Sequence, residues 1–154
     1  MSLTYFNEEL MEVLAAEEIA YLDRSEYDDD LNLIEDSFEI KVYLTGKYGV
    51  SYPISIVKDS ESADLDLRFI LFNENQVAKK QLVDLCNYLM AHYVYLRWNV
   101  HGEESDVCAV YTMTLSDDEE ENVPRLMHHI NVFAQVLDEV YPLVLRALWE
   151  DSYE

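Results

Sequence analysis

Five oxygen-bearing side chains in one acidic stretch have the spacing of a calcium-binding loop. Positions 1, 3, 5, 9 and 12 of an EF-hand template are filled by Asp28, Asp30, Asn32, Asp36 and Glu39. The sixth position requires glycine for a sharp turn but holds Leu33, and the residues from Phe38 onward alternate like a strand where an EF-hand has a helix. We therefore expect a solvated acidic loop over residues 28–39, with weak calcium binding as the alternative.

The other residue types with catalytic potential lack the spacing that chemistry requires. Neighbouring residues of a helix point about 100° apart, so His128 and His129 are poorly placed to share a metal. We expect structural roles for both, with His128 beside the apolar stripe and His129 facing outward. Cys86 and Cys108 lie among apolar residues and are expected in the core. No Ser, Cys or Thr lies on a glycine-flanked turn, and 3 glycines are too few for a phosphate-binding loop. The sequence thus predicts a protein that is not an enzyme and has no metal site and no cofactor.

An excess of acidic residues dominates the composition. The 10 Lys and Arg stand against 32 Asp and Glu, which gives a net charge of −22. Nucleic acids and anionic membranes are bound through cationic side chains, so this charge argues against both as partners. No apolar run approaches the ~20 residues of a membrane-spanning helix. The first 22 residues contain glutamate but no lysine or arginine, unlike a secretory signal. We therefore expect a cytoplasmic protein.

The densest acidic run, residues 117–121, lies where a helix is expected to begin. Carboxylates stabilise a helix N-terminus because unpaired N–H groups give it partial positive charge. We expect that structural role, and the alternative is a contact surface for a basic partner.

Hydrophobic periodicity places the elements that position these residues in one domain, residues 1–154. Helices are predicted over residues 4–22, around residues 82–93 and from Ser116 onward, and strands near residues 38–45, 50–56, 65–72, 94–100 and 107–115. Strands joined by short turns pair antiparallel. The sequence thus predicts an α+β domain of order α-β-β-β-α-β-β-α, with a five-stranded, mostly antiparallel sheet packed by helices.

Several local signals refine this arrangement. Residues 46–49 are bracketed by glycines and predict the tight turn of a β-hairpin. Pro53 cannot donate a ladder hydrogen bond, so we expect its strand at an edge or beside a bulge. Ser116 and Glu119 have capping-box spacing for the last helix. Pro142 predicts a kink or a break later in that helix.

Aromatic side chains are frequent, with 12 Tyr and 2 Trp. Because they combine apolar area with a low entropy cost, they suit binding surfaces. Our candidate partner-binding residues are Tyr43, Tyr52, Tyr95, Trp98 and Tyr111. The alternative is that these rings seal the sheet against the helices. Residues 94–100 are apolar on both faces, which indicates a central strand or a strand beneath a second subunit, and we expect a homodimer.

The element order, the acidity and the size resemble the YbjN-like and type III secretion chaperone-like families. The resemblance covers residues 4–148, with one local feature, the segment Asp138-Glu139-Val140-Tyr141-Pro142-Leu143. A D-x-x-Y-P segment of this kind looks like the closing helix of many YbjN-like domains. The resemblance implies a small acidic protein, often dimeric, that binds an extended segment of a partner without catalysis.

Our leading hypothesis is a cytoplasmic chaperone-like or adaptor protein that binds a peptide or protein through exposed apolar patches, with addition of a strand to a sheet edge as one route. The carboxylates around such patches favour partners that carry Lys or Arg. The rival hypothesis is an acidic antagonist of a basic protein, of the immunity or nucleic-acid-mimic type. A mimic needs its acids on one face, whereas along this sequence they are scattered over loops and helix ends.

Overall fold

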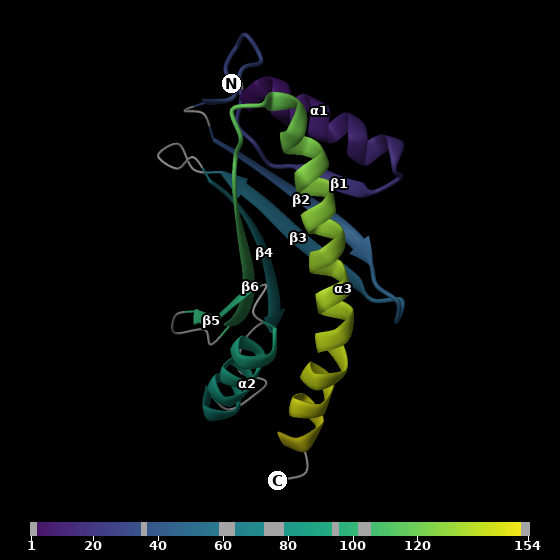
Figure 1. Cartoon of the computed structure of the whole chain (residues 1–154), viewed down its shortest axis with the longest axis vertical. Helices are drawn as coiled ribbons and strands as arrows, with labels where there is room; N and C mark the ends of the chain where they lie inside the picture. Colours follow the sequence, from purple (N-terminus) through teal and green to yellow (C-terminus); the bar gives the residue numbers. More distant parts are fainter. Residues whose placement is uncertain are drawn as a thin grey trace.

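The computed structural model describes residues 3–34, 37–58, 64–72, 79–93, 96–101 and 106–151 (Figure 1). The elements in chain order are α1 (Leu3–Ala16), β1 (Ala20–Asp23), β2 (Phe38–Thr45), β3 (Ser51–Lys58), β4 (Asp64–Phe72), α2 (Lys79–His92), β5 (Arg97–His101), β6 (Asp106–Thr114) and α3 (Glu119–Asp151). The α+β class is confirmed. The strand count differs from the prediction, since the described residues form a sheet of six strands instead of five.

Helices pack on one face of this sheet, whose order is β1-β2-β3-β4-β6-β5 with every neighbouring pair antiparallel. Figure 1 shows α3 running the length of the sheet, α1 crossing one end and α2 at the other end, where it contacts β5. On β2, Phe38, Ile40 and Val42 are buried beneath the helices, and the residues between them are half-buried or exposed. We call the side from which these intervening residues project the open sheet face.

The additional strand β1 begins where a continuing helix over residues 4–22 was predicted. The helix ends because Glu18 adopts a left-handed conformation (φ 59°), and the Ile19 N–H donates to the Leu14 carbonyl at 2.9 Å. This six-to-one hydrogen bond is the Schellman arrangement that reverses a chain at a helix C-terminus. The chain then pairs with β2, with Ala20 opposite Tyr43.

An edge position for Pro53 is wrong, because β3 lies between β2 and β4. The Gly46 N–H donates to the Val50 carbonyl at 2.8 Å, so this pair is hydrogen-bonded between β2 and β3. Bonded and non-bonded pairs alternate along an antiparallel ladder, which makes Tyr43 and Pro53 a non-bonded pair. The Pro53 nitrogen therefore faces β4. Pairing with β4 covers only Ser55–Val57. The proline is tolerated because the ladder on that side ends before reaching it.

Helix α3 is continuous from Glu119 to Asp151 and contains both Pro124 and Pro142, so the predicted break at Pro142 does not occur. Asp118 caps its N-terminus, with its Oδ1 accepting from the Glu120 N–H at 3.2 Å. The cap is therefore two residues later than the capping-box spacing predicts.

The Asp138 side chain anchors α3 to the β2–β3 hairpin. Its Oδ1 accepts hydrogen bonds from the Tyr52 hydroxyl at 2.9 Å and from the Lys47 N–H at 3.0 Å. One turn later Tyr141 packs on Tyr48 at the hairpin tip, with ring centroids 5.6 Å apart. The D-x-x-Y part of the closing segment therefore holds the last helix on the sheet.

Candidate functional site

Two of the five predicted partner-binding residues belong to the core. Tyr52 is 2% exposed and Trp98 is 1% exposed. The Trp98 Nε1–H donates to the Tyr93 carbonyl at 3.2 Å, and Tyr52 is bonded to Asp138. In a single copy of the chain, these two rings seal the sheet against the helices.

The other predicted residues are not brought together. Tyr43 projects from the open sheet face and is 38% exposed, whereas Tyr111 is half-buried beneath α3. Tyr95 lies outside the described residues. The five residues therefore do not form one surface, and their role in partner binding stays a prediction.

Tyr111 packs on His129, with ring centroids 4.5 Å apart and a hydrogen bond of 3.2 Å between the hydroxyl and Nε2. His128 is exposed and His129 is half-buried, which is the reverse of our expectation. Burial lowers the pKa of His129, and the nearby His128 and Arg125 lower it further. The lowered pKa favours the neutral imidazole of His129, which packs against the Tyr111 ring.

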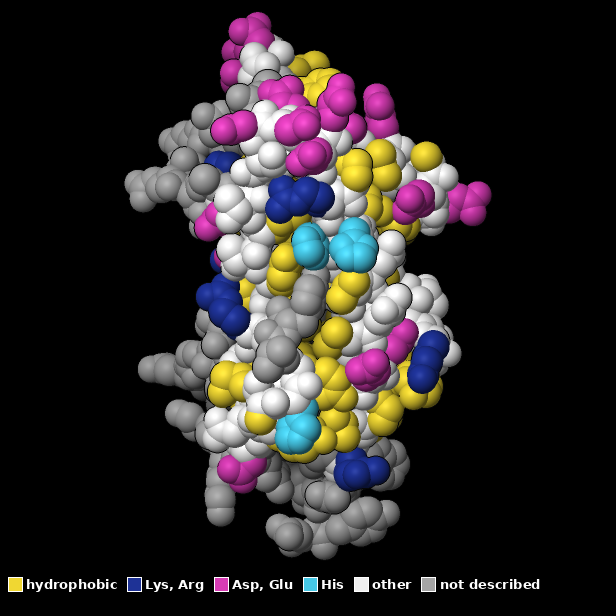
Figure 2. Space-filling model, viewed as in Figure 1, with side chains coloured by type: hydrophobic (Ala, Val, Ile, Leu, Met, Phe, Trp, Pro, Cys, Tyr) yellow, Lys and Arg dark blue, Asp and Glu magenta, His cyan; other side chains and the backbone are white. Residues whose placement is uncertain are grey.

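Three acidic segments that are distant in sequence converge at one end of the molecule. They are the first turns of α1, the loop after β1 and the start of α3, and Figure 2 shows their carboxylates gathered at the top of the view. We call this region the acidic end, and its carboxylates come from Glu8, Glu9, Glu12, Glu26, Asp28, Asp29, Asp30, Asp117, Asp118, Glu119, Glu120 and Glu121. The acidic residues are thus scattered along the sequence but lie close together in the folded chain.

Exposed apolar side chains lie among these carboxylates. Leu31 is 74% exposed and Tyr5 is 54% exposed, and Ile34 is also exposed. The short edge strand β1 runs beside α1 and carries the exposed Tyr21 and Leu22. Within the described ranges β1 pairs with β2 alone, so the backbone groups of Tyr21 point outward from the edge of the sheet, where a further strand can pair.

A buried polar network holds the loop of the acidic end against α1. Asn7 is 1% exposed and donates from Nδ2 to the Tyr27 hydroxyl at 2.6 Å, and that hydroxyl donates to Asp23. Burial and then the Asp23 carboxylate raise the pKa of Tyr27 to about 12. Among the described residues the Asn7 Oδ1 has no hydrogen-bond partner. The loop is therefore attached to the core through tyrosine.

The loop itself forms a backbone turn in place of an EF-hand. The Asp28 Oδ1 accepts from the N–H groups of Asp30 and Asn32, both at 2.9 Å. Glu39 lies in β2, and Asp36 is outside the described residues. The described ranges contain no group of three or more His, Cys, Asp or Glu side chains that could hold a metal ion. Weak calcium binding over residues 28–39 stays an open alternative.

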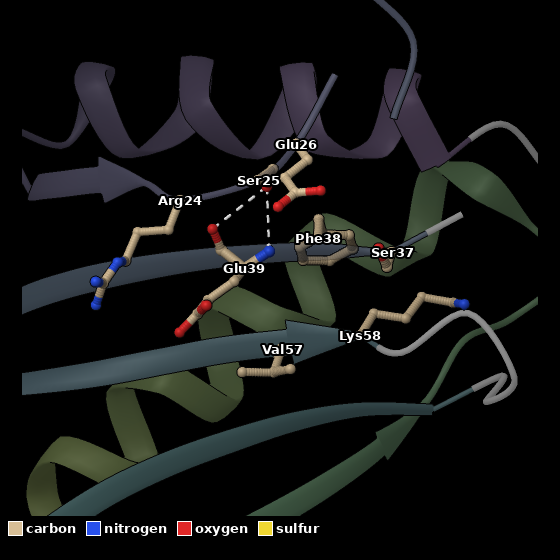
Figure 3. Close-up of a pocket in the computed structure, with 8 residues that line it drawn as sticks. All are labelled: Arg24, Ser25, Glu26, Ser37, Phe38, Glu39, Val57 and Lys58. Atoms are coloured by element: carbon tan, nitrogen blue, oxygen red, sulfur yellow. Dashed lines mark hydrogen bonds between the residues drawn. The ribbon is translucent and has the colours of Figure 1, made fainter. Parts of the chain in front are cut away.

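A shallow pocket of about 290 Å³ lies where the chain passes from β1 to β2 (Figure 3). It is lined by Arg24, Ser25, Glu26, Ser37, Phe38, Glu39, Val57 and Lys58. The Ser25 hydroxyl accepts from the Glu39 N–H at 3.1 Å and donates to the Glu39 carbonyl at 3.3 Å. The Glu39 backbone thus holds the Ser25 hydroxyl in the wall of the pocket, and charged side chains of both signs, from Arg24, Glu26, Glu39 and Lys58, surround it.

Cys86 and Cys108 are both buried, as expected, and neither forms a disulfide. Burial raises the pKa of Cys86, and the neighbouring Cys108 adds to this shift. A raised pKa keeps the thiol protonated at neutral pH and unreactive. Within the described part of the chain no helix is long and apolar enough to cross a membrane.

Comparison with known proteins adds no relative. The chain matches no protein-family model, and neither the curated proteins nor the solved structures contain a match. The resemblance to the YbjN-like and secretion chaperone-like families therefore stays a prediction.

Proposed function

We propose that this protein is a non-catalytic, cytoplasmic chaperone-like or adaptor protein that captures a basic, amphipathic segment of another protein at its acidic end. The observation that carries this proposal is the convergence of three acidic segments around exposed Leu31, Tyr5 and Ile34. The resemblance to secretion chaperones implies the same kind of function.

Charge and apolar area have different tasks in this mechanism. Carboxylates attract a cationic segment over distances of about one Debye length, ~10 Å at moderate salt, and speed its association. The exposed apolar side chains then contribute affinity by leaving water, at about 25 cal/mol per Å². The outer edge of β1 offers backbone hydrogen bonds to a segment that binds in extended form.

Synthetic peptides test this proposal directly. Three peptides share one apolar pattern and carry lysine, serine or glutamate at the polar positions, and their affinities are measured by fluorescence anisotropy. The lysine peptide should bind most tightly, and its binding should weaken with added salt. The variant Tyr5→Ser/Leu31→Asn should bind it about tenfold more weakly, because roughly 1.4 kcal/mol of apolar contact is lost. The control is Met90→Ser, which removes an exposed apolar side chain from α2 at the opposite end.

The acidic antagonist remains a second candidate, because the same convergence supplies the concentrated acidic surface that a mimic requires. A fourth peptide of lysine and serine without apolar residues separates the two candidates. If it binds as tightly as the amphipathic lysine peptide, and Tyr5→Ser/Leu31→Asn has no effect, the antagonist is favoured. If no peptide binds, the chaperone proposal is wrong.

A further inference from the structure

The open sheet face has a charge distribution unlike that of the rest of the chain. It presents both signs of charge, the cations Lys41, Arg68 and Arg97 and the carboxylates of Glu39, Asp64 and Asp66, and Arg24 lies opposite Glu39 at its edge. This face is therefore close to neutral in a protein whose net charge is −22. Two copies that meet here avoid the like-charge repulsion that opposes contact elsewhere.

The charges of this face are arranged in rungs across the strands. Lys41 is opposite Ser55, Ser55 is opposite Arg68, Arg68 is opposite Val110, and Val110 is opposite Arg97. We call these residues the basic rung. Val110 is only 5% exposed, in keeping with its place between the aliphatic stems of two arginines.

The adjacent rung, two residues nearer the acidic end, is acidic. Glu39 is opposite Val57, Val57 is opposite Asp66, and Asp66 is opposite Thr112. Within one copy the two rungs are already connected. Arg68 Nη2 lies 2.9 Å from Asp66 Oδ2, and Thr112 Oγ1 donates to Asp66 Oδ1 at 2.7 Å.

We propose that two copies of this chain pack open sheet face to open sheet face. The two-fold axis lies in the plane between the two sheets, parallel to the rungs and midway between them. A rotation about this axis places each strand over the same strand of the other copy but exchanges the two rungs, which are about 6.6 Å apart along the strands. The basic rung of each copy then lies over the acidic rung of the other. Lys41 meets Glu39 of the partner subunit, and Arg68 meets Asp66 of the partner subunit. Tyr43 and Val57 supply apolar area around these pairs.

The strands β2, β3, β4 and β6 extend on both sides of this axis and are the ones that overlap in the pair, whereas β1 and β5 lie almost wholly to one side of it. The two-fold axis also reverses the strand direction, so the acidic ends of the two copies point away from each other, and aligned packing of twisted sheets accommodates this arrangement.

Charge reversal tests this interface by sedimentation equilibrium, with folding checked by circular dichroism. The wild-type chain should be a dimer. Lys41→Glu should raise the dimer dissociation constant at least about tenfold, because each of two symmetric contacts becomes repulsive. The double variant Glu39→Lys/Lys41→Glu has the wild-type net charge and exchanges the two members of the pair, so it should restore the wild-type constant to within about threefold. Arg146→Glu makes the same charge change on exposed α3 and should leave the dimer unaffected.

Cross-linking provides a second measurement that needs no variant. A mixture of ¹⁵N-labelled and unlabelled chains treated with a carbodiimide should yield a mixed-isotope link between Lys41 and Glu39. A monomeric wild-type protein, a dimer that Lys41→Glu leaves intact, or a charge exchange that fails to restore association would each overturn the proposal. Peptide binding at the acidic end is measured separately, so either proposal can fail without the other.

Discussion

The Asp138 anchor gives a stability prediction that can be worked out from its contacts. One carboxylate oxygen accepts from the buried Tyr52 hydroxyl at 2.9 Å and from the Lys47 N–H at 3.0 Å. A hydrogen bond to a charged group contributes about 1.5–3 kcal/mol when one partner is buried, and an exposed one contributes less. Asp138→Ala should therefore lower the free energy of unfolding by about 2–3 kcal/mol. Tyr52→Phe, which leaves the Lys47 bond in place, should lower it by about 1–2 kcal/mol.

The double variant is the decisive member of this set. If the two side chains act through one hydrogen bond, Tyr52→Phe/Asp138→Ala costs less than the sum of the single changes, with a coupling energy of about 1–2 kcal/mol. Urea unfolding followed by tryptophan fluorescence, at one fixed protein concentration, measures all of these free energies. Glu139→Ala removes a neighbouring exposed carboxylate and should change stability by less than about 0.5 kcal/mol. If the cost of the double variant equals the sum of the two single costs, Tyr52 and Asp138 do not act through one hydrogen bond and the anchor is refuted.

Gly46 makes the same anchor sensitive to backbone substitution. A Cβ at Gly46 would collide with the Asp138 Oδ1 and with the Tyr52 ring. Gly46→Ala should therefore destabilise the wild type by about 1–3 kcal/mol, the usual cost of overpacking. In the Asp138→Ala background one of the two obstructing groups is absent, so the cost should be smaller. An equal cost in both backgrounds would place the collision elsewhere.

Three further predictions concern a helix end and two titrations. Glu18→Gly should raise the free energy of unfolding by about 1 kcal/mol, because glycine adopts the left-handed conformation without strain. The control Glu18→Gln removes only the charge and should give less than half of this gain. Burial raises the pKa of Tyr52 above its ordinary value of about 10, so this residue should lower stability above pH ~10 by up to about 1.4 kcal/mol per pH unit. Urea titrations at each pH should show a shallower slope for Tyr52→Phe. Burial lowers the pKa of His129, so this residue should lower stability as the pH drops below ~6.5. In thermal melts at each pH, His129→Gln should therefore lose less stability than the wild type as the pH falls through that range.

The sequence predicts the elements whose signal is local and repeated. Alternation over residues 38–45 and 50–56, with glycines at 46 and 49, specifies the hairpin, because a period of two and a turn are both visible within a few residues. The apolar stripe of α3 likewise specifies a helix, and Pro142 does not interrupt it because packing and the Asp138 anchor hold the segment in place.

The elements that the sequence does not predict depend on a backbone conformation that the residue types do not reveal. Nothing in the residue types around Glu18 marks a helix end, since the left-handed position that usually holds glycine holds a glutamate. The strand that follows, β1, is only four residues long and partly exposed, so its alternation is too short to recognise. A missed helix end therefore removes a strand from the predicted sheet.

The candidate site was only partly predictable, for a related reason. Alternation shows that Tyr52 and Tyr43 lie on opposite faces of the hairpin, but it does not show which face the helices cover. The structure buries Tyr52 and exposes Tyr43. Likewise the acidic segments are separate in sequence, and only the packing of α1 beside the start of α3 brings them together.

The distribution of charge connects the two proposals. A chain with a net charge of −22 resists self-association unless the contacting surface is locally neutral and the remaining charge is held apart. The rungs of the open sheet face meet the first condition, since Lys41 and Arg68 lie beside Glu39 and Asp66. A two-fold axis between the rungs meets the second, because it directs the acidic ends in opposite directions. Such a dimer leaves both acidic ends accessible, so two partner segments bind without competing with dimerisation, and the acidity that keeps the chains apart elsewhere attracts the basic partner.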